Sequence, residues 1–189
     1  MKPSGGRHSL LTLEPLVQAV REGVGEAGWT LSGLQKTTST EFEGRWAGES
    51  TRSAYLFFHR EDLPAEVSVE VFLDETSRGL RGTLSLVVDG PDLGELGPVP
   101  AILQRLAVAA GETLPEGYRT PLTLRLVLPD SGTVPAEAEL QLRFKLRFPA
   151  TAMEAGQSAV AALTSAAVGA FEHLLERPEV AELLPPVVD

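Results

Sequence analysis

Three basic residues alternate with apolar ones in the stretch ELQLRFKLRF, residues 139–148. Arg143, Lys145 and Arg147 recur with a period of two, so an extended strand would present them on one face and the leucine and phenylalanine side chains on the other. Guanidinium groups hold phosphate and carboxylate oxygens through paired hydrogen bonds, and a rigid row of cations neutralises a nucleic-acid backbone. This strand is therefore the first candidate binding surface of the chain.

A fourth basic residue joins this surface if the preceding apolar segment pairs with the strand. In PLTLRLVLP, residues 121–129, Arg125 falls between alternating leucines and should lie on the opposite face from them. We call the resulting set the basic strip: Arg125, Arg143, Lys145 and Arg147. Three interpretations stay open. The strip is solvated or paired with the acidic residues Glu66, Glu70 and Asp74, within the sheet or across a dimer; it docks a protein partner; or it binds nucleic acid.

The composition limits the classes of protein to which the chain can belong. Its 189 residues are 43% hydrophobic and 22% charged, as in a soluble globular protein. A formal net charge of −10 argues against indiscriminate binding to nucleic acid or membranes, although it leaves room for a local basic site. The chain has no cysteine, which excludes disulfides and zinc–thiolate sites. The apolar run 159–171 is shorter than the roughly 18 residues of a membrane span, so we expect no membrane partner and a cytoplasmic location.

No catalytic signature is present. The three histidines, His8, His59 and His173, are scattered along the chain and belong to no H-x-x-x-H metal motif or G-x-S-x-G nucleophile elbow. The paired carboxylates Glu61–Asp62 and Asp74–Glu75 fall at predicted strand ends, where charges usually mark turns. We therefore predict a non-enzymatic protein without a metal, a cofactor or catalytic residues. A deep pocket holding a buried His59 or a buried carboxylate pair would argue for an enzyme.

Two further features have an ordinary and a functional interpretation. GVGEAG, residues 23–28, matches G-x-G-x-x-G, but a dinucleotide site needs a strand before it and a helix after it. Here a predicted helix precedes and a predicted strand follows, so we interpret the stretch as the end of a helix.

A set of aromatic residues could stack on bases, although packing in the core of the first sheet is the favoured interpretation. These are Trp29, Trp46, Tyr55, Phe57 and Phe58.

Hydrophobic periodicity predicts the first half of the chain. A helix with Thr12 as its N-cap is indicated by apolar residues at helical spacing: Leu13, Leu16, Val17, Val20 and Val24. The period then changes to two, which predicts strands near 29–36, 40–47, 53–60, 66–74 and 80–89. The link ETSRG should form a hairpin loop in which Gly79 takes a positive φ.

The second half should contain two more helices around a hairpin. The first has Pro100 in its first turn, Ile102 and Leu106 on its buried side, and Gly111 at its end. A hairpin around PDSGTVP follows, and a long helix then runs to about Arg177 from a capping box formed by Thr151 and Glu154. The predicted fold class is α+β, an antiparallel sheet with three main helices in the order helix, four or five strands, helix, two strands, helix. Residues 1–9 are predicted to be a flexible lead-in, residues 10–177 a single domain, and residues 178–189 a short helical turn and a proline-containing tail.

This order of elements resembles the type III secretion chaperone fold and the related YbjN-like proteins. Three stretches carry the resemblance: LEPLVQAVREGVGEAGW for the first helix, PAILQRLAVAAG for the middle helix, and LRFKLRFPATAMEAGQSAVAALTSAAVGAFEHLL for the last strand and helix. It implies a non-enzymatic, chaperone-like or adaptor homodimer that binds another protein. The fold group also includes a bacterial DNA-processing-associated member, which implies the alternative of an accessory DNA-binding protein. No functional residue carries over from the family, so the basic strip is inferred from period and charge alone.

Overall fold

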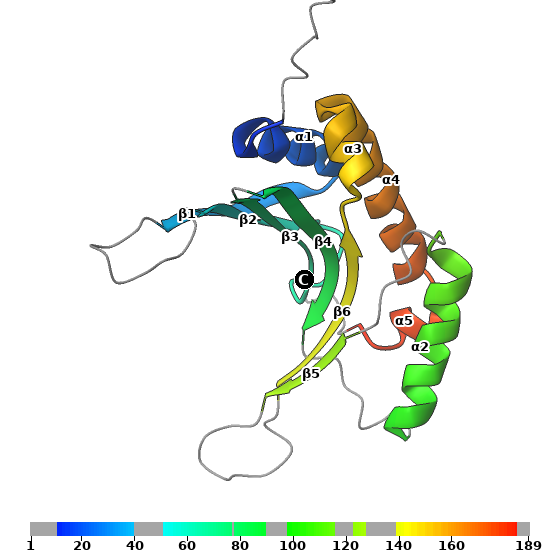
Figure 1. Ribbon diagram of the computed structural model, residues 1–189. Coiled ribbons are helices and arrows are strands. Elements are labelled where there is room, and N and C mark those ends of the chain that lie inside the picture. Colours follow the sequence, from blue (N-terminus) through cyan, green and yellow to red (C-terminus); the bar gives the residue numbers. More distant parts are fainter. Residues whose placement is uncertain are drawn as a thin grey trace, which may run out of the picture.

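The computed structural model describes residues 11–39, 51–76, 78–89, 98–115, 123–127 and 139–184. These form one six-stranded antiparallel sheet in the order β1-β2-β3-β4-β6-β5, together with five helices (Figure 1). The strands are β1 (Thr30–Ser39), β2 (Thr51–His59), β3 (Val67–Thr76), β4 (Gly79–Asp89), β5 (Thr123–Val127) and β6 (Glu139–Arg147). The predicted α+β class with an antiparallel sheet is confirmed.

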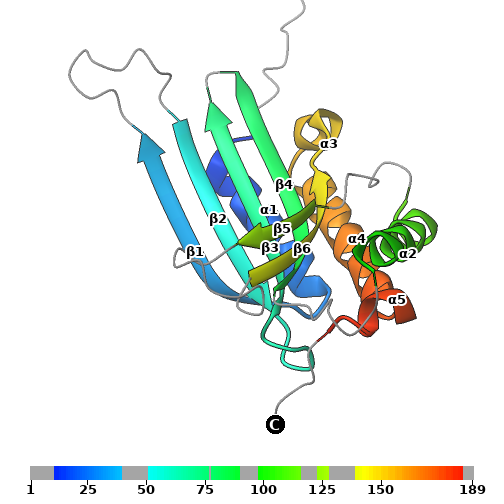
Figure 2. The same ribbon diagram turned by 90° about the horizontal axis from the view of Figure 1, so that it is seen from below.

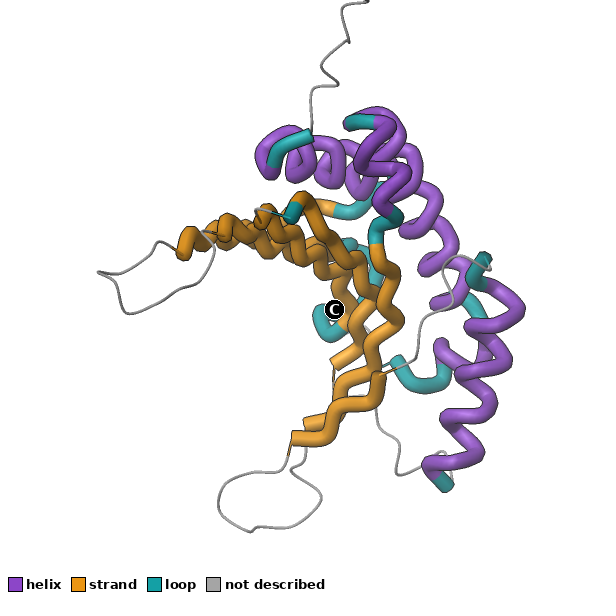
Figure 3. The backbone as a smooth tube through the Cα atoms, viewed as in Figure 1, coloured by secondary structure: helices purple, strands orange, loops and turns teal. Residues whose placement is uncertain are grey.

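All five helices lie on the convex face of the curved sheet, and no described helix covers its concave face (Figure 3). The helices are α1 (Leu13–Glu26), α2 (Val99–Thr113), α3 (Ala150–Ala155), α4 (Gln157–Leu175) and α5 (Pro178–Ala181). Helix α1 packs along α4, and α2 packs on α4 and α5. We call the uncovered concave side of the sheet the open face.

The core lies between the sheet and the helices, as the period-two pattern predicts. One face of the sheet contributes buried side chains from three adjacent strands: Val67, Val69, Val71 and Leu73 of β3, Leu84, Leu86 and Val88 of β4, and Leu142, Phe144 and Leu146 of β6. The predicted apolar stripe of α1 is buried as well, and this helix packs on β1, β2, β3 and α4. The β3–β4 hairpin also turns as predicted, with Gly79 at φ 113°.

The predicted third helix is two helices, which raises the number of helices above the expected three. Gly156 has φ 100° and separates α3 from α4, because this backbone region strongly favours glycine. The expected capping box is wrong as well. Helix α3 begins at Ala150 with Pro149 as its N-cap, so Thr151 lies inside the helix and makes no capping hydrogen bond.

Two other glycines do not end the helices in which they lie. Helix α1 continues through Gly23 to Glu26, and α2 continues through Gly111 to Thr113. Gly23 is buried where α1 crosses α4, and a Cβ placed on it would lie 2.3 Å from the carbonyl oxygen of Ala161. This glycine therefore permits close approach of two helices. Gly28, with φ 83°, follows the end of α1.

Helix α4 is longer than the apolar run that we expected to be too short for a membrane span. With 19 residues it is long and apolar enough, by length and composition, to cross a bilayer. The core helix of a folded domain can have the same length and composition, and α4 buries apolar residues such as Val160 and Phe171 within the fold.

The predicted strand at 40–47, the lead-in at 1–9 and residues 185–189 of the predicted tail lie outside the described residues.

Candidate functional site

The open face carries the basic residues of β6. Because Leu142, Phe144 and Leu146 are buried against the helices, the alternating Arg143, Lys145 and Arg147 occupy the opposite side of the strand. The backbone register pairs Arg125 of β5 with Gln141 of β6, which places it at a position of the same face. The structure thus brings the four positions of the basic strip onto one side of two neighbouring strands.

Arg143 is already paired with an acid inside the sheet. Its Nη1 lies 2.7 Å from Glu70 Oε2 on β3, and its Nη2 donates to Gln141 Oε1 over 3.2 Å. Both members of the ion pair are partly buried. The internally paired interpretation therefore applies to Arg143. It does not extend to Asp74, which accepts a hydrogen bond from Ser53 Oγ at 2.9 Å.

Lys145 and Arg147 remain exposed, and neither has an ion-pair partner among the residues that the structure describes. Arg81 of β4 adds a third exposed cation to this part of the open face, two residues before Thr83, which pairs with Arg147. Arg81 is not among the residues that the sequence predicts for the basic strip. The alternation of Arg81, Thr83 and Ser85 with Gly82 and Leu84 was the available signal, but only the register of β4 against β6 places it near the strip.

The aromatic residues divide between the core and the open face. Trp29 and Phe58 are only 3% and 1% exposed, which confirms core packing for these two. Tyr55 is 39% exposed, and its ring centroid lies 4.7 Å from that of Phe72 across the β2–β3 ladder. Phe57 of β2 is partly buried. Trp46 lies outside the described residues.

The groups considered for catalysis do not converge. His59 and His173 are exposed, as are Glu61 and Asp62, while Glu75 lies 2.5 Å from Arg52 in an ion pair. Within the described part of the chain, no group of three or more His, Cys, Asp or Glu residues could hold a metal ion. The buried His59 or buried carboxylate pair that would have argued for an enzyme is not found at these positions.

An ionic network fixes the start of β1 against the end of α4. Glu172 Oε1 accepts hydrogen bonds from Trp29 Nε1 at 3.1 Å and from Arg60 Nη1 at 2.5 Å. Arg60 also binds Asp62 at 2.6 Å. The hydrogen bond to Asp62, with the charges of Asp62 and Glu172, raises the pKa of Arg60, and the same bond lowers the pKa of Asp62. The network holds Trp29 and the first residues of β1 in one position.

Strand β1 is the longer of the two edge strands, with ten residues against five in β5 (Figure 2). Its inner edge pairs with β2, and no described strand pairs with its outer edge. Leu34 on this strand is 41% exposed.

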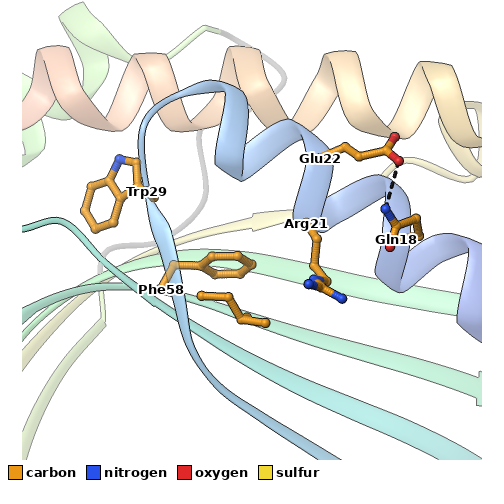
Figure 4. Close-up of a pocket in the computed structure, with 6 residues that line it drawn as sticks. Gln18, Arg21, Glu22, Trp29 and Phe58 are labelled. Atoms are coloured by element: carbon orange, nitrogen blue, oxygen red, sulfur yellow. Dashed lines mark hydrogen bonds between the residues drawn. The ribbon is translucent and has the colours of Figure 1, made fainter.

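Between α1 and the first residues of β1 lies a pocket of about 260 Å³. Its lining residues are Gln18, Arg21, Glu22, Trp29, Leu31 and Phe58 (Figure 4).

Comparison with known proteins gives no relative for this chain: no family model, no curated protein and no solved structure matches it.

Proposed function

We propose that this protein is a non-enzymatic, chaperone-like or adaptor homodimer that binds a protein partner in the cytoplasm without a cofactor. The observation that carries the proposal is the outer edge of β1, with which no strand in the described part of the chain pairs. A row of unpaired backbone N–H and C=O groups is a template for an added strand, and natural sheets usually shorten or cover such an edge. Here no described strand pairs with the outer edge of the ten-residue β1, which includes the exposed Leu34. Strand addition at an edge is a common mode of protein recognition.

The second copy is proposed to dock on the outer side of α2. Ile102, Leu106 and Ala109 face the core, and the opposite side of the helix exposes Ala107 and Val108, the latter by 49%. Small apolar side chains allow two helices to approach closely, and an interface of standard size would bury about 800 Å² per partner. With the dimer at α2, β1 stays open for the partner.

Single lysine substitutions should separate dimerisation from partner binding. We expect the wild-type chain to elute in light-scattering chromatography at twice its 20.2 kDa mass, and Val108→Lys to elute as a monomer, because a buried, unpaired ammonium opposes association. Leu34→Lys should leave the dimer intact and remove partners captured by the wild-type protein from its own host's lysate.

Each variant serves as the control for the other, since both replace an exposed aliphatic residue by the same cation. A wild-type monomer would contradict the homodimer. A dimer that survives Val108→Lys would exclude α2 as its interface. Identical sets of captured proteins for the wild type and Leu34→Lys would contradict partner binding at β1.

A second candidate function, accessory DNA binding in DNA processing, is favoured by cations that form no ion pair with any residue that the structure describes. Arg81, Lys145 and Arg147 share the open face with the exposed Tyr55, whose ring could stack on a base. Three phosphate contacts on duplex DNA predict a log–log salt slope of about −2.7, compared with about −3.6 for all four residues of the basic strip.

Charge reversal at Lys145 and Arg147 tests this candidate. In fluorescence anisotropy with labelled single- and double-stranded oligonucleotides, the double variant Lys145→Glu/Arg147→Glu should lose at least tenfold in affinity at low salt. The control is Arg21→Glu/Lys36→Glu, which makes the same change in net charge on the helix-covered side and should bind like the wild type. Equal losses in both double variants would indicate only a general effect of net charge. No binding by the wild type at low salt would exclude the candidate.

A further inference from the structure

The pocket between α1 and β1 has an apolar floor of limited size. Trp29 and Phe58 are almost fully buried, and Leu31, which pairs with Phe58 across the β1–β2 ladder, is partly exposed. The volume of about 260 Å³ is below the range of about 300–1,000 Å³ that is usual for whole small molecules. It suits a single apolar side chain inserted from a larger partner.

A positive charge at the rim of this pocket, that of Arg21, has no ion-pair partner among the described residues. Arg21 is exposed, and no other described residue forms an ion pair or hydrogen bond with its side chain. Glu22 is already engaged, because Gln18 Nε2 donates to its Oε1 over 2.9 Å. Figure 4 shows the Arg21 side chain reaching from α1 toward the sheet, on the side where Phe58 lies. Its planar guanidinium can hold a carboxylate through two hydrogen bonds.

The outer edge of β1, with which no described strand pairs, runs away from the pocket. The register is irregular between Leu31 and Gly33, where Ser32 Oγ donates to the Phe57 carbonyl over 3.0 Å, and it is regular from Gly33 to Ser39. The shift keeps Leu31 and Leu34 on the helix side of the strand, since they pair with Phe58 and Leu56. A strand added along Gly33–Ser39 would place alternate side chains over Leu34 and into the pocket.

We propose that the pocket and the outer edge of β1 together bind an extended peptide of a partner protein, with one apolar side chain in the pocket and a neighbouring carboxylate on Arg21. The carboxylate is a chain terminus or an Asp or Glu side chain. Antiparallel addition places the C-terminal end of the peptide beside Leu31 and Arg21, because β1 starts at the pocket. The inference rests on the proposed binding of a protein partner and specifies its site and chemistry.

A peptide selection tests the inference on the full chain. Random eight-residue peptides displayed with a free C-terminus are selected on the wild-type protein, and the enriched sequences are synthesised with an N-terminal fluorophore, both as acids and as C-terminal amides. We expect an apolar residue next to the terminus or next to an acidic residue. A loss of affinity on amidation assigns the carboxylate to the chain terminus, and retained affinity assigns it to the acidic side chain.

Variants of Arg21 at the pocket rim and of Leu34 on β1 decide the outcome. Arg21→Glu should weaken the selected peptides at least tenfold, Arg21→Lys should weaken them less, and Leu34→Lys should also reduce binding. Lys145→Glu, on the open face, is the control and should bind like the wild type. Circular dichroism should show all variants folded, because each changed residue is exposed.

Failure of the selection, or selected peptides that bind Arg21→Glu as tightly as the wild type, would overturn the inference. The adaptor proposal has a separate readout. If Leu34→Lys still removes captured partners while no peptide is selected, the partner uses the edge of β1 without the pocket. If neither result is obtained, the proposed function fails as well.

Discussion

Replacing Gly23 by alanine is expected to lower the free energy of unfolding by about 1–3 kcal/mol, although alanine is the better helix former. The added Cβ would lie 2.3 Å from the carbonyl oxygen of Ala161 and 2.9 Å from Cβ of Thr164 on α4. The first of these contacts is with backbone, so it cannot be relieved by a side-chain rotation. Either α1 or α4 must shift, and packing along their shared interface is lost.

Gly25 provides the matched control two residues away on the same helix. No atom lies within 4 Å of a Cβ placed there, so Gly25→Ala should raise the free energy of unfolding by about 0.5–1 kcal/mol through helix propensity alone. Urea denaturation of the two variants and the wild type measures both effects. Stabilisation by Gly23→Ala of the same size as by Gly25→Ala would contradict the close crossing of α1 and α4.

Replacing Phe171 by alanine should have a larger effect, a loss of about 3–5 kcal/mol in the free energy of unfolding. Phe171 is 1% exposed and belongs to the core cluster between the helices and the sheet. Truncation removes the transfer free energy of the ring and leaves a cavity that a close-packed interior fills only in part. The loss is a large share of the roughly 5–15 kcal/mol that stabilises a typical domain.

The measurement is again urea denaturation, with Val108→Ala as the control for a truncated apolar side chain on a helix. Val108 is 49% exposed, so its truncation should change the stability of the monomer by no more than about 0.5 kcal/mol. The comparison requires monomeric chains, so denaturation is measured at a protein concentration at which light scattering shows the wild type and both variants to be monomeric. A loss below 1 kcal/mol for Phe171→Ala would show that this part of α4 is not packed as described.

Local patterns in the sequence were sufficient to predict most elements and their inward faces. Val67, Val69 and Val71 alternate with polar residues, and Leu16 and Val20 recur at helical spacing; each set is buried in the structure. Such periods report burial directly, because a strand or helix that hides one face must repeat its apolar residues at its own geometric period. The antiparallel α+β architecture follows from these patterns and from short connections such as ETSRG.

Helix ends were predicted at the wrong glycines, because the sequence alone does not show whether a glycine ends a helix or permits close packing inside one. Gly23 and Gly156 have the same side chain, yet one lies inside a helix at a close crossing and the other separates two helices at φ 100°. Only the position of α4 relative to α1 distinguishes a packing glycine from a conformational one. The predicted capping box failed for a related reason, since the helix begins at Ala150, before the position that the motif indicated.

The basic strip shows the same division between local and long-range information. Alternation alone placed Arg143, Lys145 and Arg147 on one face, but the partner of each cation depends on strand order. Glu70 reaches Arg143 from two strands away, and Arg81 joins the open face through the β4–β6 register. The pocket beside β1 combines residues from α1, β2 and the start of β1. Sequence periodicity determined which side of each element packs into the core between the sheet and the helices. Tertiary structure decided which charges lack an ion-pair partner among the described residues, because contacts between residues far apart in the sequence leave no local periodic pattern.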